Sequence, residues 1–164
     1  MAIKSIYKLF LFLFLCAFCS TYFAQQEAVD LKKLTNSSDI IVTGKVTKQT
    51  SSWNEDKSRI YTMATVQVDD YIKGIGNGNK VTIKYLGGEV GEVGELYSHM
   101  PRFEDNEEVL VFLKKDGNNT DYKVSNGENG KISLINDPRT GELMTNSNVR
   151  VSSLKRQIKN IIAE

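Results

Sequence analysis

Apolar and polar positions alternate along several short stretches of the chain, which is the pattern of half-buried β-strands. The stretches are residues 40–47, 60–69, 81–85, 122–124 and 132–134. Residues 109–113 are instead apolar at every position, which predicts a strand buried on both faces. Leu143 and Met144 follow a turn and are expected to form the returning arm of a hairpin. The pattern therefore predicts a mostly β domain.

Two stretches have helical spacing instead. Residues 28–34 predict a short N-terminal helix, which Asn36 to Asp39 would break. Residues 149–162 predict a C-terminal amphipathic helix packed on the sheet, with Ser147 or Asn148 as its N-cap. A helix that docks on a partner would show the same spacing.

Residues 87–107 fit neither pattern, and we expect an irregular loop there. Glycines alternate with acidic residues in its first part, and Gly87-Gly88 is typical of a bulge or a sharp bend. The glycines at residues 74–78 precede a strand rather than a helix, so they predict a hairpin turn and not a phosphate-binding loop. Long loops in compact domains often carry function, which directs attention to residues 87–103.

The N-terminus has the composition of a signal peptide. Lys4 and Lys8 precede an unbroken apolar run at residues 9–18, which is too short to span a bilayer comfortably. We expect residues 1–24 to be cleaved and residues 25–163 to form a single domain that is secreted or periplasmic, with no membrane span after cleavage. An uncleaved N-terminal anchor is the alternative.

Removal of this leader changes the composition of what remains. Cys16 and Cys19 are lost with it, so the remaining chain has neither a disulfide nor a thiolate metal site. Without Lys4 and Lys8, 19 basic side chains face 20 acidic ones. This balance argues against nucleic acid or an anionic membrane surface as a partner, because both require a basic excess.

Four sequence blocks carry a resemblance to known families. They are residues 38–46 (SDIIVTGKV), 66–74 (VQVDDYIKG), 81–85 (VTIKY) and 107–113 (EEVLVFL). Their order resembles the netrin module and the N-terminal domain of the tissue inhibitors of metalloproteinases. It is also similar to a family of exported bacterial domains without assigned activity, in which Gly87-Gly88-Glu89-Val90 and Pro101-Arg102-Phe103 have counterparts.

This resemblance implies an OB-fold-like barrel of five to seven strands with a short N-terminal helix and a C-terminal amphipathic helix. The inhibitory mechanism of the tissue inhibitors of metalloproteinases cannot apply to this chain. The inhibitors ligate the protease zinc through an N-terminal cysteine, whereas the cleaved chain would begin at Gln25 and contain no cysteine.

The candidate binding residues lie in the glycine-rich loop and are Glu89, His99, Arg102 and Phe103. His99 is the only histidine, and a zinc site usually needs three or four ligands, so no metal is expected. General acid–base catalysis by His99 has no identifiable partner. Aromatic side chains offer a second possibility, a binding platform on the barrel face: Trp53, Tyr61, Tyr71, Tyr97 and Phe103.

These observations predict an exported, non-enzymatic binding or interaction module without a cofactor. Its partner would be a protein, a peptide or a carbohydrate. The alternative is an accessory or inhibitory domain acting on a secreted metalloprotease, and a hydrolase is the least favoured class.

Overall fold

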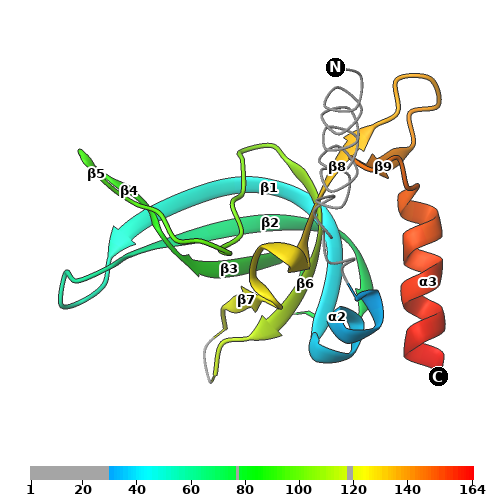
Figure 1. Ribbon diagram of the computed structural model, residues 1–164, viewed down its shortest axis with the longest axis horizontal. Coiled ribbons are helices and arrows are strands. Elements are labelled where there is room, and N and C mark those ends of the chain that lie inside the picture. The colour runs from blue at the N-terminus through cyan, green and yellow to red at the C-terminus, as the bar shows by residue number, and fades with distance from the viewer. Residues whose placement is uncertain (1–29, 77, 118–119) are drawn as a thin grey trace, which may run out of the picture.

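The computed structural model describes residues 30–76, 78–117 and 120–164 (Figure 1). The predicted signal peptide, residues 1–24, lies outside the described residues, as do Asn118 and Asn119. No helix in the described ranges is both long and apolar enough to cross a membrane.

Two long strands form the frame of the domain. β1 (Ile40–Trp53) and β2 (Ile60–Lys73) pair antiparallel over almost their whole length. In β2 the side chains alternate between buried and partly exposed, because one face of a strand packs on the core while the other faces outward. The polar segment at residues 51–57 begins within β1, which continues to Trp53 before the chain reverses.

Five strands close into a barrel, as the sequence predicts. β3 (Lys80–Leu86) pairs with β2, and β6 (Glu108–Lys115) pairs with both β7 (Tyr122–Val124) and the first half of β1. β3 and β7 form a parallel pair at Ile83 and Tyr122. The strand order β1-β2-β3-β7-β6, returning to β1, is that of an OB-fold-like barrel.

Strand β6 explains why residues 109–113 are apolar at every position. Val109, Val111 and Leu113 point into the barrel, whereas Leu110 and Phe112 point outward and pack under the helices. All five side chains are fully buried. The expectation of a strand buried on both faces is confirmed, and its cause is that β6 lies between two apolar clusters.

Both helices cover the outside of the barrel beside β6. α2 (Leu31–Ser37) has Asp30 as its N-cap, whose carboxylate accepts a hydrogen bond from the Lys33 amide. The helix therefore lies later than residues 28–34, includes Asn36 and Ser37, and ends within the predicted breaking residues. α3 (Val151–Ala163) buries Val151, Leu154 and Ile158 against the barrel. The predicted amphipathic helix is confirmed as a helix that packs on its own domain.

The predicted N-cap of α3 is wrong. The N-cap is Arg150, and its side chain makes no capping hydrogen bond. Asn148 instead has a positive φ of 61° in a turn that returns the chain from β9, with its amide donating to the Thr145 carbonyl. Asn148, which the sequence suggested as a cap, is therefore part of the turn between β9 and α3.

A second hairpin extends the sheet beyond the barrel. The short 3-10 helix η2 (Gly127–Gly130) leads into β8 (Lys131–Asn136), which pairs with β6 and then with β9 (Leu143–Thr145). The predicted hairpin arm at Leu143 and Met144 is confirmed. The glycine-rich turn before β3 is confirmed as well, and Gly74 has the positive φ of 72° that such a turn favours.

Candidate functional site

A small hairpin replaces the irregular loop expected after β3. β4 (Gly88–Val90) and β5 (Val93–Glu95) pair antiparallel around a two-residue turn, in which Gly91 has a positive φ of 63°. The expectation of an irregular stretch is wrong at these residues. Glycine and glutamate are both depleted in strands, so the composition concealed the hairpin. Figure 1 shows it at the opposite side of the barrel from α3.

Gly88 allows this hairpin to approach the inner face of the sheet. A Cβ atom at residue 88 would lie 2.2 Å from Thr62 Oγ1 and 2.4 Å from Ser51 Oγ, and φ there is +129°. The Thr62 hydroxyl donates to the Gly87 carbonyl at 2.6 Å and is 2.9 Å from the Ser51 hydroxyl. The predicted sharp bend at Gly87-Gly88 is therefore the point where the hairpin rests on β1 and β2.

The carboxylate of Glu95 fixes the second strand of the hairpin. Its Oε2 atom accepts one hydrogen bond from the Ile60 amide and one from the Tyr97 hydroxyl, each 2.9 Å long. The Arg59 guanidinium lies 5.9 Å from the centre of the Tyr97 ring. Because it carries both hydrogen bonds, Glu95 acts as a structural link between β5, β2 and the following loop.

A buried ion pair holds the returning loop. The Lys131 ammonium lies 2.6 Å from Glu107 Oε1, with only 12% and 14% of the two side chains exposed. The same ammonium donates to the Arg102 carbonyl at 2.6 Å and lies 5.3 Å from the centre of the Phe103 ring. Phe103 is in turn buried in the barrel core, with its ring centre 5.6 Å from that of Tyr85.

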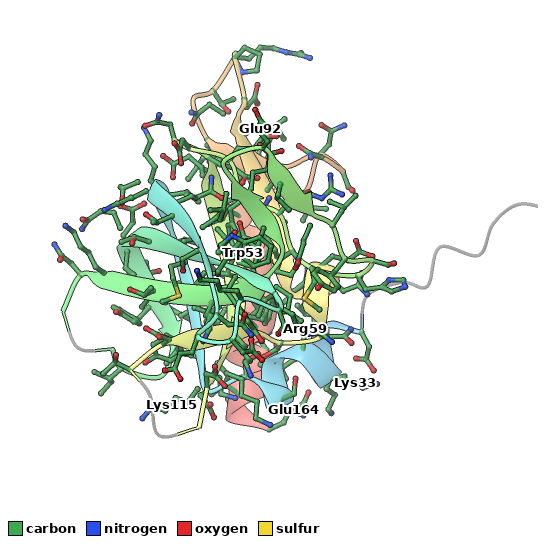
Figure 2. All side chains as sticks on the ribbon, turned by 90° about the vertical axis from the view of Figure 1, so that its left-hand side faces the viewer. Lys33, Trp53, Arg59, Glu92, Lys115 and Glu164 are labelled. Carbon is green, nitrogen blue, oxygen red and sulfur yellow. The ribbon has the colours of Figure 1, made fainter. Side chains whose placement is uncertain are left out.

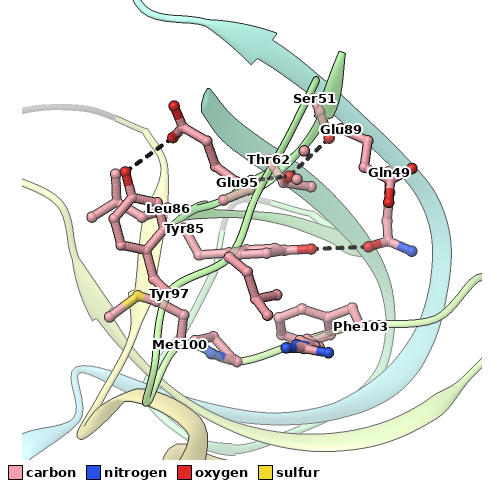
Figure 3. A pocket seen from close by; sticks show the side chains of 16 residues that line it. Gln49, Ser51, Thr62, Tyr85, Leu86, Glu89, Glu95, Tyr97, Met100 and Phe103 are labelled. Carbon is pink, nitrogen blue, oxygen red and sulfur yellow. Dashed lines mark hydrogen bonds between the residues drawn. The ribbon is translucent and has the colours of Figure 1, made fainter. Parts of the chain in front are cut away.

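Between hairpin and loop lies a cleft of about 720 Å³, which we call the end cleft (Figure 3). Its floor is the inner face of β1, β2 and β3, and its two walls are the hairpin and residues 100–103. Residues that line the cleft include Gln49, Ser51, Thr62, Tyr85, Glu89, Glu95, Tyr97, Arg102 and Phe103.

Tyr85 and Gln49 are the polar centre of the floor. The Tyr85 hydroxyl donates to Gln49 Oε1 at 3.0 Å, and the Gln49 amide donates to Asp105 Oδ1 at 3.1 Å. Burial raises the pKa of Tyr85 above its ordinary value, so its phenol is protonated at neutral pH. These bonds fix the direction of the Gln49 side chain and present neutral polar groups to the cleft.

The structure brings three of the four candidate residues to this cleft. Glu89 and Arg102 are exposed at its walls, whereas Phe103 is only 6% exposed and supports the cleft from within the core. His99 is not among the lining residues. It lines a neighbouring depression together with Arg102 and Lys131, and its side chain is 85% exposed, with Nδ1 3.3 Å from Glu128 Oε1.

Sequence reasoning missed the floor of the cleft. Gln49 and Ser51 come from β1, Thr62 from β2 and Tyr85 from β3. Strand alternation predicts that these side chains point inward. It does not distinguish a residue that lines a cleft from a residue of the hydrophobic core. In the described ranges, no group of three or more acidic or histidine side chains is placed to hold a metal ion.

The predicted aromatic platform is divided between two places. Tyr97 and Phe103 belong to the end cleft, while Trp53 and Tyr61 line a depression of about 590 Å³ on the outer face of the sheet. We call this depression the outer groove, and its other lining residues include Glu55, Asp56, Met63, Lys84 and Asp121. The Tyr71 hydroxyl donates to the Gly78 carbonyl in the β2–β3 turn and belongs to neither.

Comparison with known proteins adds no assignment to this geometry. No protein-family model matches the chain, and no curated protein matches it at a significant level. The structure itself defines an OB-fold-like barrel with a cleft at the β4–β5 end.

Proposed function

We propose that the protein is an exported, non-enzymatic binding module and that the end cleft is its ligand site. The observation that carries the proposal is the construction of the cleft. The sheet, the hairpin and the loop at residues 100–103 meet there, and contacts hold both walls. Gly88 against Ser51 and Thr62 and Glu95 against Ile60 hold the hairpin, and Lys131, paired with Glu107, holds the loop through the Arg102 carbonyl. A pre-organised concave site of this kind is typical of ligand binding.

The chemistry of the lining supports binding over catalysis. Glu95 is occupied by two hydrogen bonds, and Tyr85 is a protonated donor that is already bonded to Gln49. A general acid and base would need partners whose pKa values are separated by their surroundings. The polar groups of the floor instead form fixed hydrogen bonds, which suit recognition.

A polypeptide ligand fits this lining better than a carbohydrate. Sugar recognition relies on a free aromatic face, but Phe103 is buried and the Tyr97 ring already has Arg59 nearby. The hairpin wall, by contrast, offers exposed backbone at Gly94 and an exposed carboxylate at Glu89. Main-chain groups and charges are what an extended peptide recognises.

Two tyrosines provide a matched test of the proposal. The processed chain, purified after export, is screened by saturation-transfer NMR against capped ten-residue peptides of basic, acidic and neutral composition and against oligosaccharides of glucose, mannose and N-acetylglucosamine. Tyr85→Phe removes the floor hydroxyl, and Tyr71→Phe removes an equivalent hydroxyl bond outside the cleft. Each lost hydrogen bond costs about 1 kcal/mol of folding stability, so the two variants should be equally stable.

For a panel compound that binds, we expect Tyr85→Phe to weaken binding about fivefold and Tyr71→Phe to leave it unchanged. Equal affinities of the two variants would overturn the assignment of the cleft. Catalytic turnover of a panel compound by the wild-type chain would overturn the proposal of a non-enzymatic module.

A further inference from the structure

Strand β5 has one free edge. It pairs with β4 on one side, and among the described residues no other strand pairs with it. A free edge exposes unpaired amide and carbonyl groups, and proteins usually protect such edges because another chain can add to them. Two of the three residues of β5, Gly94 and Glu95, line the end cleft.

The hairpin register determines which groups face this edge. Val90 and Val93 flank the two-residue turn, so they form the hydrogen-bonded closing pair. Hydrogen-bonded and non-hydrogen-bonded pairs alternate in an antiparallel ladder, which makes Glu89 and Gly94 a non-hydrogen-bonded pair. The amide and carbonyl of Gly94 therefore point away from β4 and toward the free edge.

Gly94 also leaves the cleft face of the hairpin uncovered. A Cβ atom placed on it would have the Glu89 side chain as its nearest neighbour, with Cγ at 3.4 Å. Adjacent strands lie about 4.8 Å apart, so a long side chain on an added strand could cross Gly94 and reach the Glu89 carboxylate. Glycine at this position opens a path between an added strand and Glu89.

The charge of the hairpin indicates which kind of side chain on an added strand would bind Glu89. Residues 87–98 contain three acidic side chains and no basic one. Within the part of the chain that the structure describes, the side chains of Glu89 and Glu92 make no hydrogen bond or ion pair, unlike that of Glu95. Figure 2 shows Glu92 well separated from Arg59 at this end of the molecule.

Apolar exposure at the same edge is the second independent feature. Val93 is 48% exposed and Leu96 is 75% exposed, both within or next to β5. Side chains alternate along a strand, so Val93 faces away from Gly94 while Leu96 shares its face. An added strand with alternating basic and apolar or neutral residues would therefore meet complementary groups on both faces.

We infer that the free edge of β5 receives an extended basic segment of another polypeptide as an added antiparallel strand, with a lysine or arginine opposite Gly94 and in contact with Glu89. This inference rests on the proposed function and names the ligand class for one wall of the cleft. A second copy of this chain is disfavoured as the occupant, because pairing β5 with β5 would bring the acidic side chains of two hairpins together.

Backbone methylation tests the added strand directly. The probe is a capped ten-residue peptide of alternating lysine and threonine, with a glutamate–threonine peptide as its charge-reversed counterpart. In the inferred register the lysine amides face β5 and the threonine amides face away. Methylating the lysine amides should weaken binding roughly tenfold or more, because it removes main-chain hydrogen bonds, whereas methylating the threonine amides should change it little. Equal effects of the two methylation patterns would overturn the inference.

Two variants test the charge contribution on the protein. Replacing Glu89 and Glu92 together by glutamine should weaken binding of the lysine–threonine peptide about threefold to tenfold and flatten its dependence on salt. Replacing Glu55 by glutamine and Asp56 by asparagine together is the matched control, since it also removes two exposed acidic charges but at the outer groove. An equal loss of affinity in the control would mean unspecific attraction and would contradict the inference.

The outcomes separate this inference from the proposed function. Failure of the lysine–threonine peptide to bind, while another panel compound binds in a manner sensitive to Tyr85→Phe, would overturn the added strand and leave the cleft as a ligand site. Binding of the peptide that is sensitive to lysine-amide methylation but insensitive to Tyr85→Phe would retain the edge and overturn the role of the cleft floor.

Discussion

The end cleft and the outer groove lie on opposite faces of the same three strands and contain similar residue types. The cleft has three aromatic side chains and the groove has two, and each has at least two acidic ones. They differ in what holds these groups. The cleft is built from three segments joined by a buried ion pair, a glycine contact and a doubly bonded carboxylate. The groove is one face of the sheet with a polar turn at its border. On that face the Lys84 ammonium lies 4.6 Å from the Tyr61 ring centre.

This difference teaches that residue content alone does not identify a site. Aromatic and acidic side chains are present in both places. In the cleft, specific contacts hold the aromatic side chains and Glu95, whereas exposed charges surround the aromatic side chains of the groove. A ligand that binds the cleft encounters groups already held in place and loses less conformational freedom on binding. The predictions below test this contrast, beginning with the largest effect.

Substitution of the glycine beneath the hairpin should have the largest effect. Gly88→Ala places a Cβ atom against Thr62 and Ser51 at a φ that other residues rarely adopt, and we expect a loss of about 4 kcal/mol in the free energy of unfolding. Gly117→Ala is the control in the turn after β6, where φ is +61° but nothing lies within 4 Å of the added Cβ atom, and it should cost about 1 kcal/mol. Urea denaturation measures both, and equal losses would contradict the role of Gly88.

Disruption of the ion pair that anchors the loop comes next. Lys131→Met leaves Glu107 mostly buried without its cation, with an expected cost of about 3 kcal/mol. Lys123→Met breaks the more exposed pair between Lys123 and Asp116, which should cost about 0.5 kcal/mol or less. Thermal or urea unfolding of the two variants gives the comparison. A Lys131 variant as stable as the Lys123 variant would show that the loop is not held by this pair.

The sequence predicts the strands of the barrel better than it predicts the hairpin that forms the cleft. The strands of the barrel are predictable because alternation and the apolar run at residues 109–113 follow directly from burial on one face or on two. Hairpin β4–β5 is not predictable in this way, because glycine and glutamate have low strand propensity. The hairpin depends instead on contacts with Ser51, Thr62 and Ile60, which are distant in sequence.

The candidate site was predictable in part. Glu89 and Arg102 were expected from the glycine-rich segment and do line the cleft, whereas Tyr85 and Gln49 have the pattern of ordinary strand residues. Phe103 lines the cleft from the core, since an aromatic residue in a loop gives no sign in the sequence of whether it faces solvent or the barrel.

The phenol of Tyr85 predicts a smaller, pH-dependent effect. Burial raises its pKa, so the folded state holds the phenolic proton more tightly than the unfolded state does. This contribution to stability is complete below about pH 10 and is lost as the pH rises through the raised pKa. Denaturation between pH 8 and 11.5 should therefore show a shallower alkaline decline for Tyr85→Phe than for the wild-type chain. An identical decline would contradict the burial of this phenol.

The smallest effect is expected at the turn bordering the groove. Hydrogen bonds from the Ser58 hydroxyl and amide lower the pKa of Asp56, which lies on the surface. Ser58→Ala removes the hydroxyl bond and should raise the pKa of Asp56 toward its ordinary value without a measurable change in ligand binding. An NMR titration of the carboxyl carbon follows the shift. A change in affinity for a cleft ligand would show that the groove takes part in binding.

The most direct test of the central claim is a map of amide chemical-shift changes on the ¹⁵N-labelled processed chain, titrated with a compound of the panel that binds. If the end cleft is the ligand site, the changes will concentrate at residues 86–96 and 100–103 and at Gln49 on the floor. Changes centred instead on Trp53, Tyr61 and Lys84 would place the ligand in the outer groove and contradict the account.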